Sequence, residues 1–191
     1  MRVIAGLAKR AVLFAPEGLV TRPTADRSKE SLFNILSSSV PGARVLDLYA
    51  GSGAMGIEAL SRGAAEAVFV DQAKAAVDAI TANLIKTGLA YSATVMRVPV
   101  KQALKNLASK MENRSSGFDI IFMDPPYGDR LIKPTLEIVA QYDLLTPGGL
   151  IVAEDEASED SPTISQFLLY DSRTYGRTRF LFYKSSRLCP A

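Results

Sequence analysis

Residues 44–56 read RVLDLYAGSGAMG, and this segment indicates the architecture of the whole chain. Residues 44–49 form a short apolar run that is typical of a buried strand. The glycines at positions 51, 53 and 56 follow in the spacing G-x-G-x-x-G and lead into a helix predicted over residues 55–62. A strand that turns tightly into a helix is the first unit of a nucleotide-binding sheet. The segment therefore predicts a parallel sheet with a ligand site beside the glycine turn, residues 51–53.

The rest of the chain repeats this strand–turn–helix unit. Further strands are predicted over residues 67–71, 94–98, 119–124 and 149–154. Further helices are predicted over residues 73–84 and 132–142, and another follows the third strand and ends at about residue 111. This alternation predicts an α/β fold with a doubly wound, mostly parallel, Rossmann-like sheet. Residues 167–175 and 178–184 flank Gly176 and read as a C-terminal antiparallel hairpin.

Residues 1–40 lack this pattern. Residues 1–14 alternate weakly between apolar and polar side chains, which favours a small β arm. A helix capped by Thr24 or Asp26 is predicted to continue through Ser39, before Pro41 and Gly42 end it. We therefore divide the chain into an N-terminal basic arm and helix, residues 1–40, appended to a Rossmann-like domain, residues 41–191.

The composition narrows the chemistry that the chain can carry out. The chain has 191 residues, 48% of them hydrophobic, with no apolar run as long as a membrane span, and we expect no signal peptide. It has no histidine, and its single cysteine is Cys189. These absences argue against histidine-dependent catalysis, a disulfide framework and a metal site, and they favour a reducing, cytoplasmic location. Catalysis is expected to depend on carboxylates, backbone groups and a cofactor.

The basic side chains gather at the two ends of the chain. Residues 1–29 carry six basic and two acidic side chains, and residues 173–191 carry five basic and no acidic ones, whereas the segment between them is acidic. This segregation favours contact between the ends and a polyanion, although solvated termini have the same pattern. The candidate phosphate-binding residues are Arg2, Lys9, Arg10, Arg22, Arg27, Arg177 and Arg179. Arg22 and Arg27 could instead serve the helix start or intramolecular ion pairs.

Three carboxylates each follow or end a predicted strand and suggest a particular ligand. Asp71 lies twenty positions after Gly51, where an acid typically holds ribose hydroxyls. Asp47 lies beside the glycine turn, where it would repel a pyrophosphate but would suit an ammonium group. S-adenosylmethionine has an ammonium group, a ribose and no phosphate. We therefore expect this cofactor, with Gly51, Ser52 and Gly53 allowing its close approach to the backbone.

The third carboxylate begins the tetrapeptide Asp124-Pro125-Pro126-Tyr127, which follows the predicted strand. Prolines have no N–H, so this turn is rich in acceptors. Asp124 and the Pro125 carbonyl could accept hydrogen bonds from an amino group, while Tyr127 stacks on the ring that carries it. The simpler interpretation is a strand that two prolines terminate. Because the carboxyl ends of parallel strands meet at one edge, we expect all three carboxylates to share a site.

These segments resemble those of a known family. The stretch from Asp47 to Gly53 resembles the cofactor motif of class I methyltransferases, and the tetrapeptide resembles that of enzymes that methylate exocyclic amines. From end to end the chain is similar to the RsmD family of 16S rRNA guanine-N2 methyltransferases. The segments that carry this likeness begin at Met1, Arg22, Glu30, Gly56 and Tyr175 and read MRVIAG, RPTADR, ESLFNIL, GIEALSRGA and YGRT.

The resemblance implies methyl transfer to N2 of guanine 966 in 16S rRNA, within the small ribosomal subunit or its assembly intermediate. It implies Asp124, Pro125 and Tyr127 as catalytic residues, with the target base leaving its stack to reach them. It implies cofactor binding by Asp47, Tyr49, Gly51, Ser52, Gly53, Asp71 and Val98. Pro99 stands where the family usually has an acid that contacts the adenine amine, so we expect the Val98 carbonyl to substitute and the affinity to fall. We expect a monomer.

Other functions share some of these features. An N6-adenine methyltransferase of DNA or RNA needs the same tetrapeptide, and only the longer resemblance separates the two. A nicotinamide-dependent oxidoreductase could use the same glycine turn, but Asp47 argues against its pyrophosphate. A non-catalytic RNA-binding assembly factor could keep the fold, but it would not need Asp124 and Tyr127.

Overall fold

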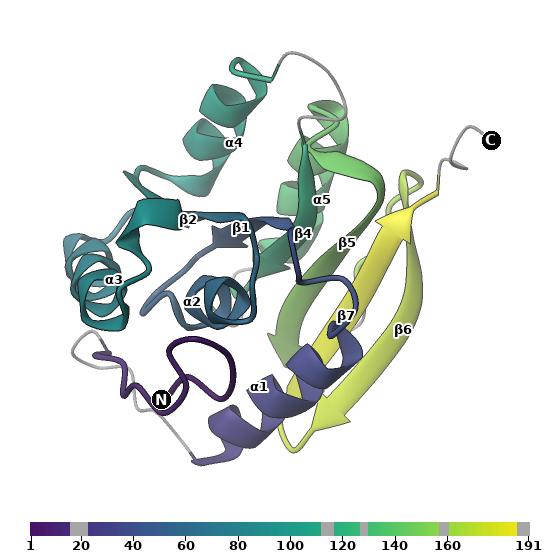
Figure 1. Ribbon diagram of the computed structural model, residues 1–191. Helices are drawn as coiled ribbons and strands as arrows, with labels where there is room; N and C mark the ends of the chain where they lie inside the picture. Colours follow the sequence, from purple (N-terminus) through teal and green to yellow (C-terminus); the bar gives the residue numbers. More distant parts are fainter. Residues whose placement is uncertain (16–22, 112–116, 127–129, 157–160, 187–191) are drawn as a thin grey trace.

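The computed structural model describes residues 1–15, 23–111, 117–126, 130–156 and 161–186 of the chain (Figure 1). The strands are β1 (Arg44–Leu48), β2 (Glu66–Asp71), β3 (Ala93–Arg97), β4 (Phe118–Met123), β5 (Leu145–Glu156), β6 (Phe167–Tyr175) and β7 (Thr178–Ser185). The helices are α1 (Pro23–Ile35), α2 (Ala54–Ser61), α3 (Lys74–Thr87), α4 (Val100–Ala108) and α5 (Ile132–Gln141), with a short 3-10 helix over Ala90–Ser92. Among these described residues, no helix is both long and apolar enough to cross a membrane.

One seven-stranded sheet organises the molecule, in the order β3-β2-β1-β4-β5-β7-β6. Strands β1 to β5 pair in parallel, and β7 joins β5 antiparallel, followed by β6. The fold class is therefore confirmed: a doubly wound α/β sheet that ends in an antiparallel hairpin. The strand order reverses between β1 and β4, which is the place where open α/β sheets bind ligands.

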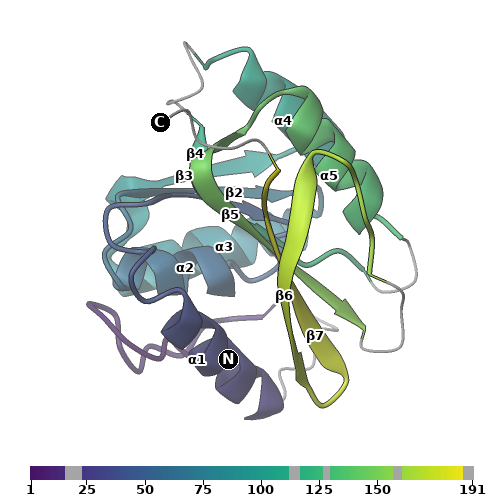
Figure 2. The same cartoon turned by 90° about the vertical axis from the view of Figure 1, so that its right-hand side faces the viewer.

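Helices cover both faces of the sheet (Figures 1 and 2). A first hydrophobic cluster packs α1, α2 and α3 on one face, and a second packs α4 and α5 on the other. The central strands are buried on both faces, so they have continuous apolar runs rather than alternating ones. This is why the parallel strands could be predicted from the sequence.

Several predicted boundaries differ from the structure. Helix α1 begins at Pro23, so Thr24 and Asp26 lie inside its first turn and do not precede it as caps, and α3 continues beyond residue 84 to Thr87. The helix expected to continue through Ser39 ends at Ile35, because Ser37 and Ser39 donate backbone hydrogen bonds three residues back, to Asn34 and Leu36. Such bonds form turns that tighten the end of a helix. The fifth strand, expected over residues 149–154, runs from Leu145 to Glu156, because β7 pairs with it as far as Glu156.

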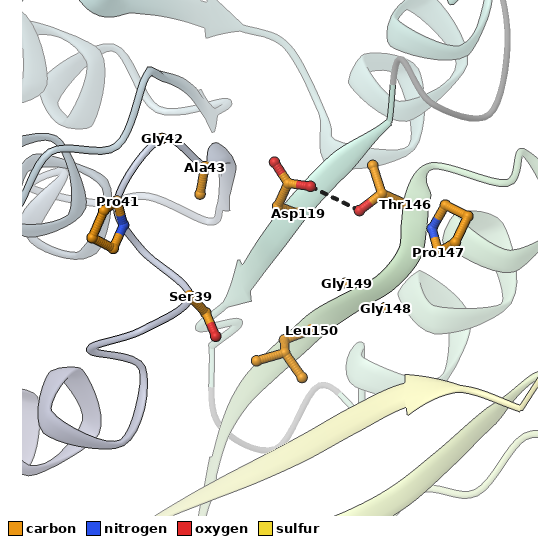
Figure 3. Close-up of a pocket in the computed structure, with 10 residues that line it drawn as sticks. All are labelled: Ser39, Pro41, Gly42, Ala43, Asp119, Thr146, Pro147, Gly148, Gly149 and Leu150. Carbon is orange, nitrogen blue, oxygen red and sulfur yellow. Dashed lines mark hydrogen bonds between the residues drawn. The ribbon is translucent and has the colours of Figure 1, made fainter. Parts of the chain in front are cut away.

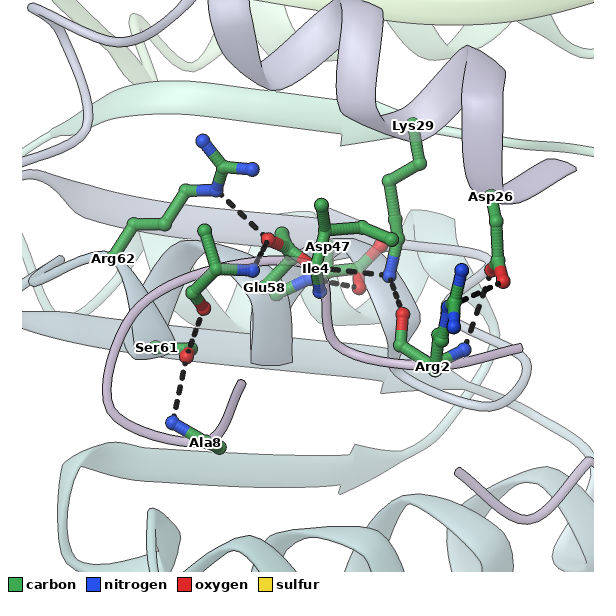
Figure 4. Close-up of polar contacts among 11 residues, drawn as sticks. Arg2, Ile4, Ala8, Asp26, Lys29, Asp47, Glu58, Ser61 and Arg62 are labelled. Carbon is green, nitrogen blue, oxygen red and sulfur yellow. Dashed lines mark hydrogen bonds and ion pairs between the residues drawn. The ribbon is translucent and has the colours of Figure 1, made fainter. Parts of the chain in front are cut away.

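The N-terminal arm, residues 1–15, lies across α2 and α3. Its own residues pair through an isolated bridge between Arg2 and Val12 and through backbone hydrogen bonds, such as that from Val3 N–H to Ala11 O at 2.9 Å. It is held to α2 by Glu58, which accepts hydrogen bonds from the backbone N–H groups of Ile4 at 2.8 Å and Ala5 at 3.1 Å. Glu58 is fully buried and also binds Lys29 of α1 at 3.0 Å (Figure 4). This carboxylate therefore joins three segments that are distant in the sequence.

Candidate active site

Asp47 lies at the carboxyl end of β1, beneath the start of α2. Its Oδ2 accepts a hydrogen bond from the backbone N–H of Gly56 at 2.9 Å. The side chain is buried, and this burial, together with the negative charge of Asp71, raises the pKa of the Asp47 carboxyl to about 7 against the lowering effect of the Gly56 hydrogen bond. Asp47 therefore holds the first turn of α2 in place beside the glycine turn.

The glycine turn is locked to the end of β2 by Asp71. The N–H of Gly51 donates to Asp71 Oδ2 at 3.0 Å, and the N–H of Ala73 donates to Oδ1 at 2.9 Å. Gly51 and Gly53 have φ values of 55° and 75°, which favour glycine. A Cβ on Gly56 would lie 2.3 Å from the ring of Phe69, so the third glycine is needed for close packing of α2 on the sheet.

Tyr49 lies between β1 and the glycine turn. Its φ of 58° is unusual for a residue with a side chain, and such strain is concentrated at functional sites. Its hydroxyl forms a hydrogen bond of 2.8 Å with the Oγ1 of Thr135 on α5. Burial raises the pKa of the Tyr49 hydroxyl. This hydrogen bond ties the segment between β1 and the glycine turn to α5 on the other face of the sheet.

Asp124 follows β4 directly, and its backbone N–H donates to Leu48 O at 3.4 Å. Desolvation of the Asp124 carboxyl and the nearby negative charges of Glu154 and Asp47 raise its pKa well above the usual range. Asp124 is also accessible to solvent, which offsets part of the desolvation. The carboxyl is thus an acceptor at the surface that has negative neighbours.

Register and alternation place Asp47, Asp124 and Glu154 on one face of the sheet. Met123 pairs with Leu48 on one side and Ala153 on the other, so the next residues, Asp124 and Glu154, are neighbours on adjacent strands, about 5 Å apart. Residues two positions before these three acids all belong to the cluster beneath α1, α2 and α3: Val45, Phe122 and Val152. Because side chains alternate along a strand, the three acids share that face.

The sequence did not predict Glu154 as a site residue. Glu154 is the last residue of the strand predicted over residues 149–154, and in the structure it lies in β5 and pairs with Phe180 of β7. The one available signal was alternation, because Glu154 continues the register of Leu150 and Val152.

The remaining predicted cofactor and catalytic residues are distributed as follows. Val98 is half-buried and follows Arg97, which pairs with Asp71, so it lies near the same edge of the sheet. Pro125 is buried directly after Asp124. Tyr127 lies outside the described residues. Within the described chain, no group of three or more His, Cys, Asp or Glu residues could hold a metal ion.

The predicted phosphate-binding residues lie on three segments rather than in one cluster. Lys9 and Arg10 on the arm and Arg27 on α1 are exposed. Figures 1 and 2 both place the arm, α1 and the turn between β6 and β7 toward the lower side of the molecule. Arg22 lies outside the described residues.

Three of the predicted basic residues form ion pairs within the protein. Arg2 pairs with Asp26 at 3.3 Å, and Arg177 pairs with Glu156 at 3.2 Å. The Arg179 side chain is only 13% exposed and pairs with Asp155 at 3.1 Å, so it reaches solvent far less than the other two. Their role in binding RNA stays a prediction.

A cavity of about 290 Å³ lies at the opposite edge of the sheet (Figure 3). It is lined by residues before β1 and at the starts of β4 and β5, including Asp119 and the turn at Gly148 and Gly149. Asp119 accepts hydrogen bonds from the backbone N–H of Arg44 at 2.8 Å and the hydroxyl of Thr146 at 2.9 Å. Its carboxylate therefore links β4 to the start of β1 and to β5.

Known proteins resemble this chain along most of its length. The model of the family described as "Conserved hypothetical protein 95" matches residues 1–184. The Bacillus subtilis protein named "Putative rRNA methyltransferase YlbH" is 40% identical, over 96% of this chain and 98% of its own. The Escherichia coli "Ribosomal RNA small subunit methyltransferase D" is 32% identical, over 96% of this chain and 89% of its own. The solved structure of "Putative methyltransferase yhhF from Escherichia coli" has 30% identity and a TM-score of 0.80, and the match covers 97% of both chains.

Proposed function

This chain belongs to the RsmD family, and on that premise we propose that it transfers a methyl group from S-adenosylmethionine to N2 of a guanine in small-subunit rRNA. The position expected from the family resemblance is guanine 966 of 16S rRNA. The observation that carries the proposal is the position of Asp124. It directly follows β4, on the face of the sheet that also holds Asp47, so an acceptor for an amino group lies beside the expected cofactor site.

The residues at this edge fit the cofactor. Asp47 has one oxygen bound to Gly56, which leaves the other for an ammonium group or a bridging water. Asp71 accepts one backbone hydrogen bond on each oxygen, and its remaining lone pairs suit a ribose diol. When bound, S-adenosylmethionine supplies an electrophilic methyl group.

The pairing of Asp124 with Glu154 supports guanine rather than adenine as the target base. Guanine presents N1–H and the N2 amino group side by side, so two adjacent carboxylates can each accept a hydrogen bond. Adenine presents an unprotonated N1 beside its N6 amino group, and this acceptor would face a carboxylate. Two acceptors that face each other repel, and neither makes a hydrogen bond. The position of Glu154 next to Asp124 on the neighbouring strand thus favours N2 of guanine.

The proposed mechanism depends on positioning and charge. The amino group of guanine is a weak nucleophile, because its lone pair is delocalised into the ring. Hydrogen bonds to Asp124 and the Pro125 carbonyl would hold the nitrogen with its lone pair toward the methyl group. The nitrogen becomes positive during transfer, and the Asp124 carboxylate stabilises that charge. The raised pKa of Asp124 also makes it a competent acceptor for the proton that the methylated nitrogen then loses.

The target base would enter from the side on which the arm and α1 lie. We propose that exposed cations there, Lys9, Arg10 and Arg27, contact backbone phosphates and position the particle. Tyr127 would stack on the base that leaves its helix. We propose that the small ribosomal subunit or an assembly intermediate is the substrate, and that the enzyme acts as a monomer.

Labelled-methyl transfer onto small ribosomal subunits that lack this modification tests the proposal. The purified protein is incubated with these subunits and labelled S-adenosylmethionine, and the RNA is digested to nucleosides. The expected product is N2-methylguanosine at one site. Recovery of N6-methyladenosine instead, or of no labelled nucleoside, would contradict the proposal.

A further inference from the structure

Asn83 on α3 connects the N-terminal arm to the glycine turn. Its side chain is fully buried. Its Oδ1 accepts a hydrogen bond from the backbone N–H of Phe14 at 2.7 Å, and its Nδ2 donates to the carbonyls of Phe14 and Ser52, each at 2.9 Å. One side chain therefore contacts both the arm and the turn where the cofactor is expected.

These bonds use both N–H groups of the amide and one acceptor site. A planar amide has two donors and one oxygen, so Asn83 pairs with Phe14 much as a neighbouring strand residue would. The second N–H binds the carbonyl of Ser52 in the middle of the glycine turn. A shift of either segment breaks hydrogen bonds of a buried polar group, which is unfavourable. The positions of the arm and the turn are thus linked through one amide.

The arm has a second attachment that does not reach the turn. Lys86, one turn of α3 later, donates from Nζ to the carbonyl of Val12 at 2.6 Å. The same ammonium lies 4.4 Å from the centre of the Phe14 ring, and that ring is 55% exposed. Lys86 thus fixes the arm to α3 alone, and it offers a matched comparison with Asn83.

We propose that Asn83 is a positioning residue that couples cofactor binding at the glycine turn to RNA binding on the N-terminal arm. The inference rests on the function proposed above, which assigns these two ligands to these two segments. A bound cofactor holds the glycine turn and with it the Ser52 carbonyl. Through Asn83 this also holds the arm, so the arm loses less conformational entropy when RNA binds. Coupling between two bound ligands is reciprocal, so RNA must strengthen cofactor binding by the same factor.

The test compares affinities in the presence and absence of the other ligand. Calorimetry measures binding of S-adenosylhomocysteine to the wild-type protein alone and with small ribosomal subunits that lack the modification. The expected result is tighter binding with subunits, by about five-fold or more. In Asn83→Ala this ratio should fall to one. In Lys86→Ala subunit binding should weaken, while the ratio stays at the wild-type value because the amide is intact.

A measurement on the wild-type protein covers the case in which Asn83→Ala does not fold. Hydrogen exchange of the Phe14 amide, whose proton is bound to Asn83, should slow when S-adenosylhomocysteine is added. The Ala8 amide, which is bound to the hydroxyl of Ser61, serves as the control on the same arm and should slow less. Equal slowing of both amides, or a ratio that Asn83→Ala leaves unchanged, would overturn the inference. If both ligands bind independently, the inference fails although the proposed function stands; if neither binds, the proposed function fails first.

Discussion

The two ends of β4 carry aspartates with opposite surroundings. Asp119, near its start, accepts hydrogen bonds from Arg44 and Thr146 and lines a cavity of about 290 Å³. Asp124, just past its end, lies beside the negative charges of Glu154 and Asp47, and its carboxyl pKa is raised well above the usual range. The same residue type on the same strand is therefore satisfied at one edge of the sheet and opposed by like charges at the other.

This difference indicates which edge is the site. A carboxylate whose bonds are made within the protein stabilises the fold and has little left to offer a ligand. Neighbouring carboxylates repel each other, and folded proteins concentrate such groups at functional sites. The cavity at the amino edge is thus a weaker candidate than the carboxyl edge. The strained φ of Tyr49, 58°, lies at the carboxyl edge as well.

The largest effect is expected when the charge of Asp124 is removed. The same change at Asp119, near the other end of β4, serves as the control. Asp124→Asn should lower kcat by about 100-fold or more, because the amide cannot stabilise a cationic nitrogen. Asp119→Asn should leave kcat near the wild-type value and lower the free energy of unfolding by about 1–3 kcal/mol, since it disturbs hydrogen bonds between strands. Methyl-transfer kinetics and urea unfolding of both variants check this. An active Asp124→Asn enzyme would end the assignment of the site.

A second prediction concerns Glu58, a buried carboxylate whose charge is balanced by cations. It binds Lys29 at 3.0 Å and Arg62 at 2.8 Å, and burial lowers the pKa of Lys29 although Glu58 opposes the shift. Glu58→Ala should lower the free energy of unfolding by about 3–5 kcal/mol, because it leaves a buried ammonium without its partner. Denaturant unfolding measures this. Glu66→Ala is the control, since the side chains of Glu66 and its partner Arg44 are 45% and 38% exposed, and loss of this pair should change stability by about 1 kcal/mol or less.

A third prediction uses the pKa of Asp47, which is raised to about 7. An acid whose pKa is higher in the folded state than in the unfolded state stabilises the fold fully at a pH below its unfolded pKa. This contribution to the free energy of unfolding is lost as the pH rises through the folded pKa. Asp47→Asn removes this titration but keeps an acceptor for Gly56. Between pH 5 and pH 8, the variant should therefore gain about 3 kcal/mol of unfolding free energy relative to the wild type. Parallel unfolding curves across this pH range would contradict the buried-charge account.

The smallest expected effect is a shift of a pH profile. Transfer requires ionised Asp124, so activity should rise with pH through its raised pKa. Glu154→Gln removes one negative neighbour, which should lower the pKa of Asp124 and move the acidic limb to lower pH. Glu156→Gln, two residues further along β5, should leave the limb in place. Methyl-transfer rates of both variants and the wild type are measured as a function of pH. If the acidic limb of the profile is the same in Glu154→Gln as in the wild type, Glu154 is not part of the site.

Much of the fold could be predicted because its signals are local. Parallel strands buried on both faces read as apolar runs, and the glycines at 51, 53 and 56 locate the first turn directly. Convergence of Asp47, Asp71 and Asp124 followed from one rule, that parallel strands end at a common edge. These inferences needed no knowledge of distant partners.

The remaining features depend on partners that are far away in the sequence. The fifth strand continues past Glu154 to Glu156 because β7 pairs with it, and the position of Glu154 beside Asp124 depends on the register between β4 and β5. Asn83 sits in an alanine-rich helix, and its sequence neighbours give no sign that it reaches Phe14 and Ser52. The bond between Tyr49 and Thr135 joins segments 86 residues apart. Such contacts follow from packing, so local patterns could not predict them.

Backbone amide chemical shifts, followed while S-adenosylhomocysteine is titrated into the protein, test most directly which edge holds the methyl donor. The account predicts that the amides of Gly51, Gly53 and Asp71 move the most, and that those of Gly148 and Gly149 beside the other cavity stay where they are. If the amides at Gly148 and Gly149 shift and the glycine turn does not respond, the site lies at the other edge and the account is wrong.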